Sequence, residues 1–123
     1  MPIFWEIPDF PSNGSTMKVE VTSAKWGGYL RGGSASGLSE MVVTKEHDKY
    51  STQIFAESLK GEGRLMTIYF MSSSGNTVHT YLTYELHDTL ISGYSLSGGD
   101  KPVESISLNF GKIIAKTEPA PKI

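Results

Sequence analysis

The fold class is decided by one stretch, YLTYELHDTLISGYSLSGGDKPVESISLNFGK, which covers residues 81–112. Polar and apolar residues alternate along it, as in its last part, where Ile106, Leu108 and Phe110 alternate with serine and asparagine. A period of two is typical of a half-buried strand, because successive side chains point to opposite faces of a sheet. The stretch therefore predicts three strands, separated by a short break at residues 86–89 and by the polar loop at residues 97–103.

The alternation slips by one residue at Gly111. The apolar phase that ends at Phe110 resumes at Ile113. A slip of one residue at a glycine is typical of a β-bulge, which bends a strand and often lies at a barrel corner. We therefore expect a structural bulge at Phe110 and Gly111, with Phe110 anchored in the core.

Four further strands and one helix complete the prediction. The strands are expected at residues 3–7, 17–24, 40–45 and 65–71. A helix is expected from Ser51 to Lys60, because Ser51 is a good N-cap and Gly61 can supply the left-handed residue that ends a helix. The apolar stripe that should dock this helix on the sheet consists of Ile54, Phe55 and Leu59.

The composition fits one domain with one core, since the chain has 123 residues. We expect a mostly β domain over residues 1–123, a single β-barrel of two antiparallel sheets with one short α-helix, and a short flexible tail from about Thr117. The 11 basic and 13 acidic residues give no basic surface for nucleic acid or anionic membrane. The absence of cysteine excludes disulfides, thiolate metal sites and thiol nucleophiles.

The N-terminal segment MPIFWEIPDFP has neither the basic region nor the apolar run of a signal peptide. No apolar run is long enough to predict membrane insertion. If this protein leaves the cell, we expect a route other than general secretion.

Residues 65–71 are apolar on both faces of the expected strand. One interpretation is a central strand, covered by the core on one face and by the helix on the other. The other is a subunit interface formed by Met66, Ile68, Tyr69 and Phe70.

The glycine-rich segment WGGYLRGGSASGL, residues 26–38, lacks the lysine and the following helix of a phosphate-binding loop. It is either a solvated loop or a protruding contact arm. The second interpretation depends on four side chains of types enriched at interfaces, Trp26, Tyr29, Leu30 and Arg31.

We expect no enzyme activity, cofactor or metal. His87 and Asp88 are neighbours on an expected strand and would point to opposite faces, and no nucleophile elbow precedes a serine. The remaining histidines, His47 and His79, are too scattered to predict a metal site.

The stretch at residues 81–113 resembles the C-terminal half of the haemolysin-coregulated proteins (Hcp), the tube-forming subunits of the bacterial type VI secretion system. Weaker similarity extends to residues 47–63, 17–27 and 3–7. The residues that carry the strongest part of the resemblance are Tyr81, Leu82, Tyr84, Leu86, Asp88, Ile91, Ser92, Tyr94, Pro102, Glu104, Ser105, Ser107, Leu108, Asn109, Phe110, Lys112 and Ile113.

The resemblance implies a homo-hexameric ring that stacks into the inner tube of the secretion machine. It implies sheath and spike proteins and effectors as partners, and assembly in the cytoplasm followed by export without a signal peptide. It favours residues 65–71 as the subunit interface, and the segment from Trp26 to Arg31 as the contact between stacked rings. It also implies a polar lumen, which we assign to the strand faces rich in serine and threonine.

Two alternatives stay open. A tail-tube subunit of a phage-like particle would have the same barrel. A monomeric barrel could instead bind a small ligand or glycan on a platform formed by Trp5, Trp26 and Tyr29.

Overall fold

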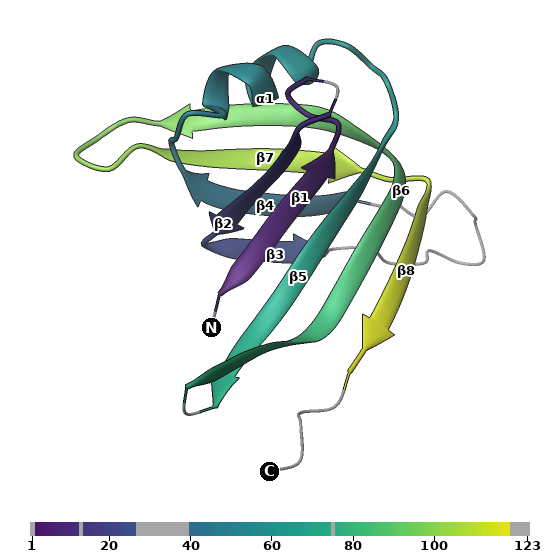
Figure 1. Ribbon diagram of the computed structural model, residues 1–123. Coiled ribbons are helices and arrows are strands. Elements are labelled where there is room, and N and C mark those ends of the chain that lie inside the picture. Colours follow the sequence, from purple (N-terminus) through teal and green to yellow (C-terminus); the bar gives the residue numbers. More distant parts are fainter. Residues whose placement is uncertain (1, 13, 27–39, 75, 119–123) are drawn as a thin grey trace, which may run out of the picture.

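The computed structural model describes residues 2–12, 14–26, 40–74 and 76–118, and it is mostly β with one short α-helix (Figure 1). Across these ranges, no helix has the length and apolar character needed to cross a membrane. The elements in chain order are β1 (Ile3–Pro8), β2 (Thr16–Val21), β3 (Ser23–Trp26), β4 (Glu40–Glu46), α1 (Ser51–Glu57), β5 (Arg64–Ser74), β6 (Thr77–Ser97), β7 (Val103–Asn109) and β8 (Lys112–Thr117).

The strands pair antiparallel in two sheets that share β6. Sheet A consists of β2, β1, β5, the first part of β6 and β8. Sheet B consists of β3, β4, β7 and the last part of β6. The expected break at residues 86–89 is a bend within this one strand, where Asp88 adopts a φ of 53°. Residues up to Thr89 pair with β5, and those from Leu90 onward pair with β7.

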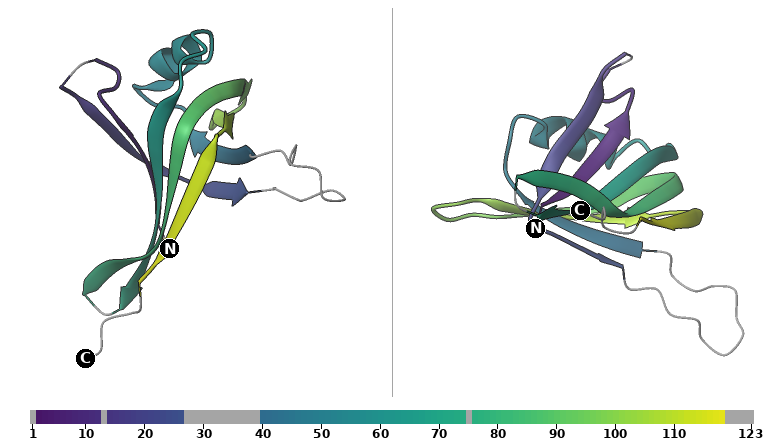
Figure 2. Two further views of the ribbon diagram at one scale, coloured as in Figure 1. Left: turned by 90° about the vertical axis from the view of Figure 1, so that its right-hand side faces the viewer. Right: turned by 60° about the horizontal axis from the view of Figure 1, so that its bottom comes forward.

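A second corner lies at Thr22, between β2 and β3. The strand expected at residues 17–24 is therefore two strands, one in each sheet. The corner is fastened to β4, because the Thr22 amide donates to the Thr44 carbonyl oxygen at 2.7 Å. The two sheets diverge from their corners, as Figure 2 shows. The predicted fold class is confirmed, but the sheet is not closed: within the described residues its ladder ends at β2 and at β3.

The core lies between the inner faces of the two sheets. In β2 and β7 every second residue is buried, as the alternation in the sequence predicts. The buried apolar side chains are Trp5, Ile7, Phe10, Met17, Val19, Val21, Met41, Val43, Ile54, Met66, Ile68, Leu86, Ile91, Ile106, Leu108 and Phe110.

The slip at Gly111 marks a change of sheet. β7 ends at Asn109 in sheet B, and β8 begins at Lys112 and pairs with the first part of β6 in sheet A. The Gly111 amide donates to the His87 carbonyl oxygen at 3.0 Å, which joins this corner to the bend in β6. The predicted bulge within one strand is thus a corner between two strands.

Helix α1 is shorter than predicted, and it lies at one end of the two sheets (Figure 1). Tyr50 stands at its N-cap, without a side-chain cap, so the prediction that Ser51 caps the helix is wrong. Its end also differs from the prediction: the helix ends at Glu57 with Ser58 as C-cap, and Gly61, which adopts the expected left-handed φ of 72°, lies three residues beyond that cap.

Of the predicted apolar stripe of α1, only Ile54 is fully buried. Phe55 is 50 % exposed, but its ring meets Tyr94 of β6 edge-on at 5.6 Å between centroids, whereas Leu59 is 74 % exposed. Glu57 takes the inward position instead, because its carboxylate accepts a hydrogen bond from Arg64 Nε at 2.5 Å. A paired carboxylate can be buried where an unpaired one could not.

Candidate functional site

The outward face of sheet B is rich in hydroxyl side chains. One row crosses all four strands in register, from Ser23 of β3 to Thr44 of β4, Ser105 of β7 and Ser95 of β6. The next row adds Ser107 of β7. Thr44, Ser105 and Ser107 face away from the core because their neighbours along β4 and β7 are buried, and Ser23 and Ser95 share their face through the register.

The hydroxyl face carries little charge. Its charged side chains are Lys25 and Glu40 on one side of the Ser23–Ser95 row and Glu46 on the other. Several hydroxyls bond to their neighbours, as Thr22 Oγ1 does to Thr44 Oγ1 at 3.0 Å and Ser92 Oγ does to the Ser107 carbonyl oxygen at 3.3 Å. Hydroxyl groups donate and accept hydrogen bonds without a fixed charge, so this face offers many weak and unselective contacts.

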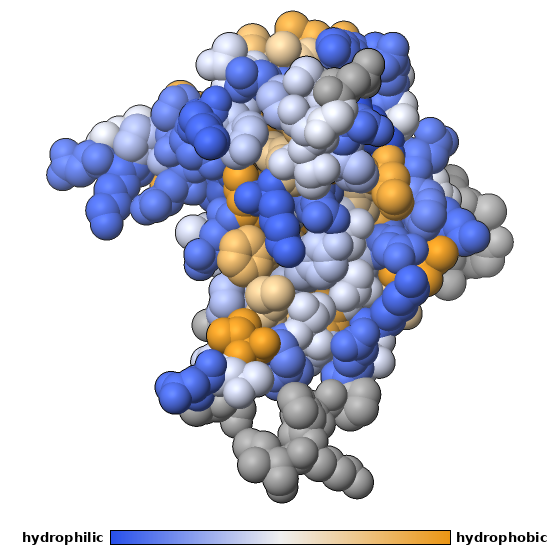
Figure 3. All heavy atoms as spheres, viewed as in Figure 1, coloured by the Kyte–Doolittle hydropathy of each residue, from blue (hydrophilic) through white to orange (hydrophobic). Residues whose placement is uncertain are grey.

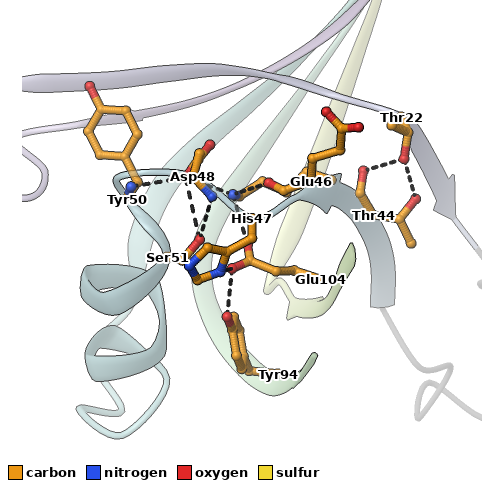
Figure 4. A network of polar contacts seen from close by, with 10 residues as sticks. Thr22, Thr44, Glu46, His47, Asp48, Tyr50, Ser51, Tyr94 and Glu104 are labelled. Atoms are coloured by element: carbon orange, nitrogen blue, oxygen red, sulfur yellow. Dashed lines mark hydrogen bonds and ion pairs between the residues drawn. The ribbon is translucent and has the colours of Figure 1, made fainter. Parts of the chain in front are cut away.

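An ion network lies inside the protein, between sheet B and α1. Lys45 of β4 and Glu104 of β7 are register partners, and neither side chain has exposed surface. Lys45 Nζ lies 2.8 Å from Glu104 Oε1 and 2.9 Å from Asp48 Oδ1. The other carboxylate oxygen of Glu104 accepts from Tyr94 Oη at 2.6 Å and lies 3.1 Å from His47 Nδ1 (Figure 4).

These contacts keep Glu104 ionised. Burial alone would raise the pKa of the Glu104 carboxyl, but hydrogen bonds from Lys45, Ser51 and Tyr94 outweigh it, so this pKa lies below its ordinary value. Burial and the hydrogen bond to Glu104 raise the pKa of Tyr94 to about 12. The network holds the β4–α1 connection on sheet B and offers no free nucleophile.

The sequence contains a signal for this network that the strand prediction does not use. On β4, Met41, Val43 and Lys45 are alternate residues that point inward. On β7, Glu104 points inward in the same way as Ile106 and Leu108. Two residues of opposite charge, each at an inward-pointing position of a strand that is otherwise apolar there, indicate a buried ion pair when the two strands are neighbours.

Only Trp26 of the predicted stacking segment lies in the described part of the chain. It ends β3, its side chain is 49 % exposed, and its ring meets the edge of Tyr84 at 6.3 Å between centroids. Tyr29, Leu30 and Arg31 lie outside the described residues. Trp5 is fully buried, so it cannot belong to a glycan-binding platform.

The predicted subunit interface is wrong for Met66 and Ile68. Both are fully buried in the core of one chain, so they have no surface to offer a second subunit. They are the core side of a central strand, since β5 pairs with β1 and β6. Tyr69 and Phe70 are only partly buried and point to opposite faces of this strand.

Tyr69 belongs to a polar cluster on the outer face of sheet A. Its hydroxyl donates to Glu6 at 2.8 Å, and Lys18 Nζ lies 4.7 Å from its ring centroid. Burial and the Glu6 carboxylate raise the pKa of Tyr69 to about 12. Across the same face, Lys116 donates to Glu85 at 2.8 Å. The charges on this face are largely compensated.

The histidines are separated. His47 contacts Glu104, His79 lies 3.2 Å from Ser72 Oγ, and His87 lies 3.4 Å from Glu85. Within the described ranges, no group of three or more acidic, histidine or cysteine side chains could hold a metal ion.

Comparison with known proteins identifies the family. The family model described as "Type VI secretion system effector, Hcp" matches residues 11–116. No curated protein matches the chain.

Several solved structures share the fold at low sequence identity. Hcp1 from Salmonella typhimurium has a TM-score of 0.75 at 19% identity, over 96% of this chain and 86% of that one. The secreted protein Hcp3 from Pseudomonas aeruginosa has a TM-score of 0.70 at 15% identity, over 97% and 99%. The tube-terminating cap of the anti-feeding prophage has a TM-score of 0.64 at 11% identity, over 94% and 88%. Since the family model covers most of the chain and these structures share its fold, the chain belongs to the Hcp family of the type VI secretion system.

Proposed function

We propose that this chain is a structural subunit of the type VI inner tube, which closes into hexameric rings that stack and are exported by the machine. The observation that carries the proposal is the family match over residues 11–116. Sheath and spike proteins would be its partners in the machine. The protein would assemble in the cytoplasm and leave the cell with the tube.

The arrangement of sheet B supports ring formation. Within the described residues, β3 pairs only with β4, and the last part of β6 pairs only with β7. Sheet B therefore has a free edge at each end, and each edge presents unpaired backbone groups. A head-to-tail contact between two different surfaces of identical subunits closes a ring when the rotation fits.

The hydroxyl face of sheet B is the candidate lumen wall. A ring joined through the edges of sheet B would turn one face of that sheet toward its axis. The nearly neutral hydroxyl row from Ser23 to Ser95 suits a surface that must hold effectors weakly and then release them. The role is structural and requires no catalytic group.

Native mass spectrometry of the purified protein at micromolar concentration tests the ring. We expect a mass about six times that of the 13.4 kDa chain. A monomer at every concentration would contradict the proposal and favour a monomeric ligand-binding protein. Electron microscopy of concentrated samples should show stacked rings.

Cysteine labelling tests the lumen, because the natural chain has no cysteine. Ser95→Cys places one thiol on the hydroxyl face, and Lys18→Cys places one on the outer face of sheet A. In assembled tubes, a small maleimide should label both variants, whereas a bulky polyethylene-glycol maleimide should label only Lys18→Cys. Equal labelling of both by the bulky reagent would place Ser95 outside the lumen.

A second candidate is a tube component of a phage-like particle, which the structural likeness to the anti-feeding prophage cap favours. Co-purification of the chain with sheath proteins of each type separates the two candidates. Assembly only with a phage-type sheath would favour the second.

A further inference from the structure

One carboxylate side chain lies where β6 passes from sheet A to sheet B. Asp88 forms the bend of β6 with its φ of 53°. Directly after it, Thr89 still pairs with β5 in sheet A, and Leu90 already pairs with β7 in sheet B. Figure 1 shows that β8 also starts beside this bend. Asp88 therefore occupies the joint between the two sheets.

The Asp88 side chain lies against two glycines from other parts of the chain. Gly63 directly precedes β5, and Gly111 lies at the corner between β7 and β8. The Gly111 amide donates to the carbonyl oxygen of His87, the residue before Asp88, at 3.0 Å. Three segments that are distant in sequence thus meet at this one side chain.

The position of Gly63 has no room for a side chain. A Cβ atom there would overlap Asp88 Oδ1 and would lie only 3.3 Å from the backbone carbonyl carbon of Asp88. Rotation of the carboxylate would relieve the first contact but not the second, so the bend itself would have to shift. Gly63 does not adopt a positive φ, so the close approach of Asp88, rather than the backbone conformation, calls for glycine here.

The position of Gly111 gives the contrast. A Cβ atom there would lie 3.5 Å from both Cβ and Oδ2 of Asp88, which is an ordinary van der Waals distance. Gly111 does not adopt a positive φ either. One methyl group therefore fits on this side of Asp88 but not on the Gly63 side, so Gly111→Ala is a matched control for Gly63→Ala.

We propose that the Asp88 side chain, seated against Gly63 and Gly111, is a latch that fixes the angle between sheet A and sheet B. The latch itself is a property of the single chain. Its consequence for assembly rests on the proposed function, because sheet B carries the edges that close the ring. A ring closes only when the rotation between its subunits fits, so a changed angle between the sheets should disturb closure.

Spin labels measure this angle directly, because the natural chain has no cysteine to interfere. A label at Lys18→Cys reports on sheet A, and one at Ser95→Cys reports on sheet B. Labelled protein diluted into unlabelled protein gives the distance within one chain by pulsed electron paramagnetic resonance. Gly63→Ala should shift or broaden the distribution of this distance, whereas Gly111→Ala should match the parent. An unchanged distribution in Gly63→Ala would overturn the inference.

A rescue variant keeps the test decisive if Gly63→Ala folds poorly. Asp88→Gly suits the φ of 53° and removes the carboxylate that the new methyl group would meet. Gly63→Ala alone should lower the urea midpoint by about 1 M. The double variant, Gly63→Ala with Asp88→Gly, should recover most of that loss. A double variant no more stable than Gly63→Ala would overturn the inference.

Native mass spectrometry separates the latch from the ring. The variants keep the exposed apolar side chains, which lie in small groups over the face in Figure 3, so a changed mass reports geometry rather than a lost contact. Gly63→Ala should give oligomers of more than one mass, and Gly111→Ala should give the wild-type mass. Rings of wild-type mass in Gly63→Ala would overturn the consequence for assembly. A monomeric wild type would overturn the proposed function, while the spin-label distances would still decide on the latch.

Discussion

Lys45 and Glu104 place opposite charges side by side within the protein, each without exposed surface. Removing one partner leaves the other charge buried without compensation, which is costly. Lys45→Met should therefore lower the free energy of unfolding by ~3–5 kcal/mol. The double variant Lys45→Met with Glu104→Leu should regain much of that loss, because no lone charge remains. Urea unfolding measures the free energy of unfolding of each variant. A double variant whose loss of stability equals the sum of the losses of the two single variants would contradict the prediction.

The pH dependence of stability should report the Glu104 carboxyl. Its pKa in the folded protein lies below its ordinary value of 4.5. A carboxyl with a lowered folded pKa contributes stability above its unfolded pKa, and this contribution is lost as the pH falls through the folded pKa. Wild type should thus lose more stability below pH 4.5 than Glu104→Gln. The pKa of Glu85 is also lowered, but this group is present in both proteins and cancels in the difference. Parallel pH profiles would contradict the assignment.

Asp88 forms the bend in β6 with a φ of 53°, a conformation that aspartate and asparagine adopt more readily than other side chains. Asp88→Val should cost ~1–2 kcal/mol, because a branched side chain is strained there. Asp88→Asn should be nearly neutral. Because Asp88 is exposed, lost packing does not obscure the comparison in thermal unfolding. Equal costs of the two changes would show that the backbone conformation is not the cause.

At the scale of elements, α1 depends on few inward residues. It is seven residues long, which is too short for a stable isolated helix. Ile54→Ala should therefore cost ~2–5 kcal/mol, because Ile54 is fully buried. Leu59→Ala should change stability little, since most of that side chain is in solvent. The two denaturant midpoints give the comparison, and similar midpoints would mean that α1 docks differently.

The elements also show which parts of the sequence pattern were reliable. Alternation correctly predicts that Ile106, Leu108 and Phe110 are buried. The short helix after β4 is also predicted correctly, from an apolar stripe at helical spacing. Alternation does not reveal that the chain changes sheet at Gly111. A one-residue shift in the alternation looks the same in a sequence whether it comes from a bulge within one strand or from a corner between two strands. For α1, the periodicity does not reveal that Glu57 would point inward, because this depends on Arg64 of the next strand.

At the scale of the whole molecule, the proposed ring joins through the backbone edges of sheet B, and its candidate lumen wall carries mostly hydroxyl groups rather than charges. Salt weakens contacts between exposed charges, since the screening length falls from ~10 Å at 0.1 M to ~3 Å at 1 M. Ring mass should therefore change little over this range. Light scattering across a salt series measures it, and rings that dissociate at high salt would indicate that ion pairs join the subunits instead.

The sequence by itself determined the mostly β class, the position of most strands and the resemblance to the Hcp family. These follow from a period of two, from glycine positions and from a run of matching residues, all of which are local in the chain. The residue types of the hydroxyl face were also predictable, because serines occupy the outward phase of β7.

Only the tertiary structure decided which strands became neighbours. The alternation along a strand predicts which face of the sheet a side chain points to, but it does not predict which other element covers that face. Met66 and Ile68 are therefore core residues, because β5 lies centrally in its sheet and the core covers that face. Lys45 and Glu104 form an ion pair because β4 and β7, which are far apart in the sequence, are neighbours in sheet B. The contact of Trp26 with Tyr84 likewise arises only in the fold, because β3 is distant in sequence from the β5–β6 hairpin that carries Tyr84 and Phe70.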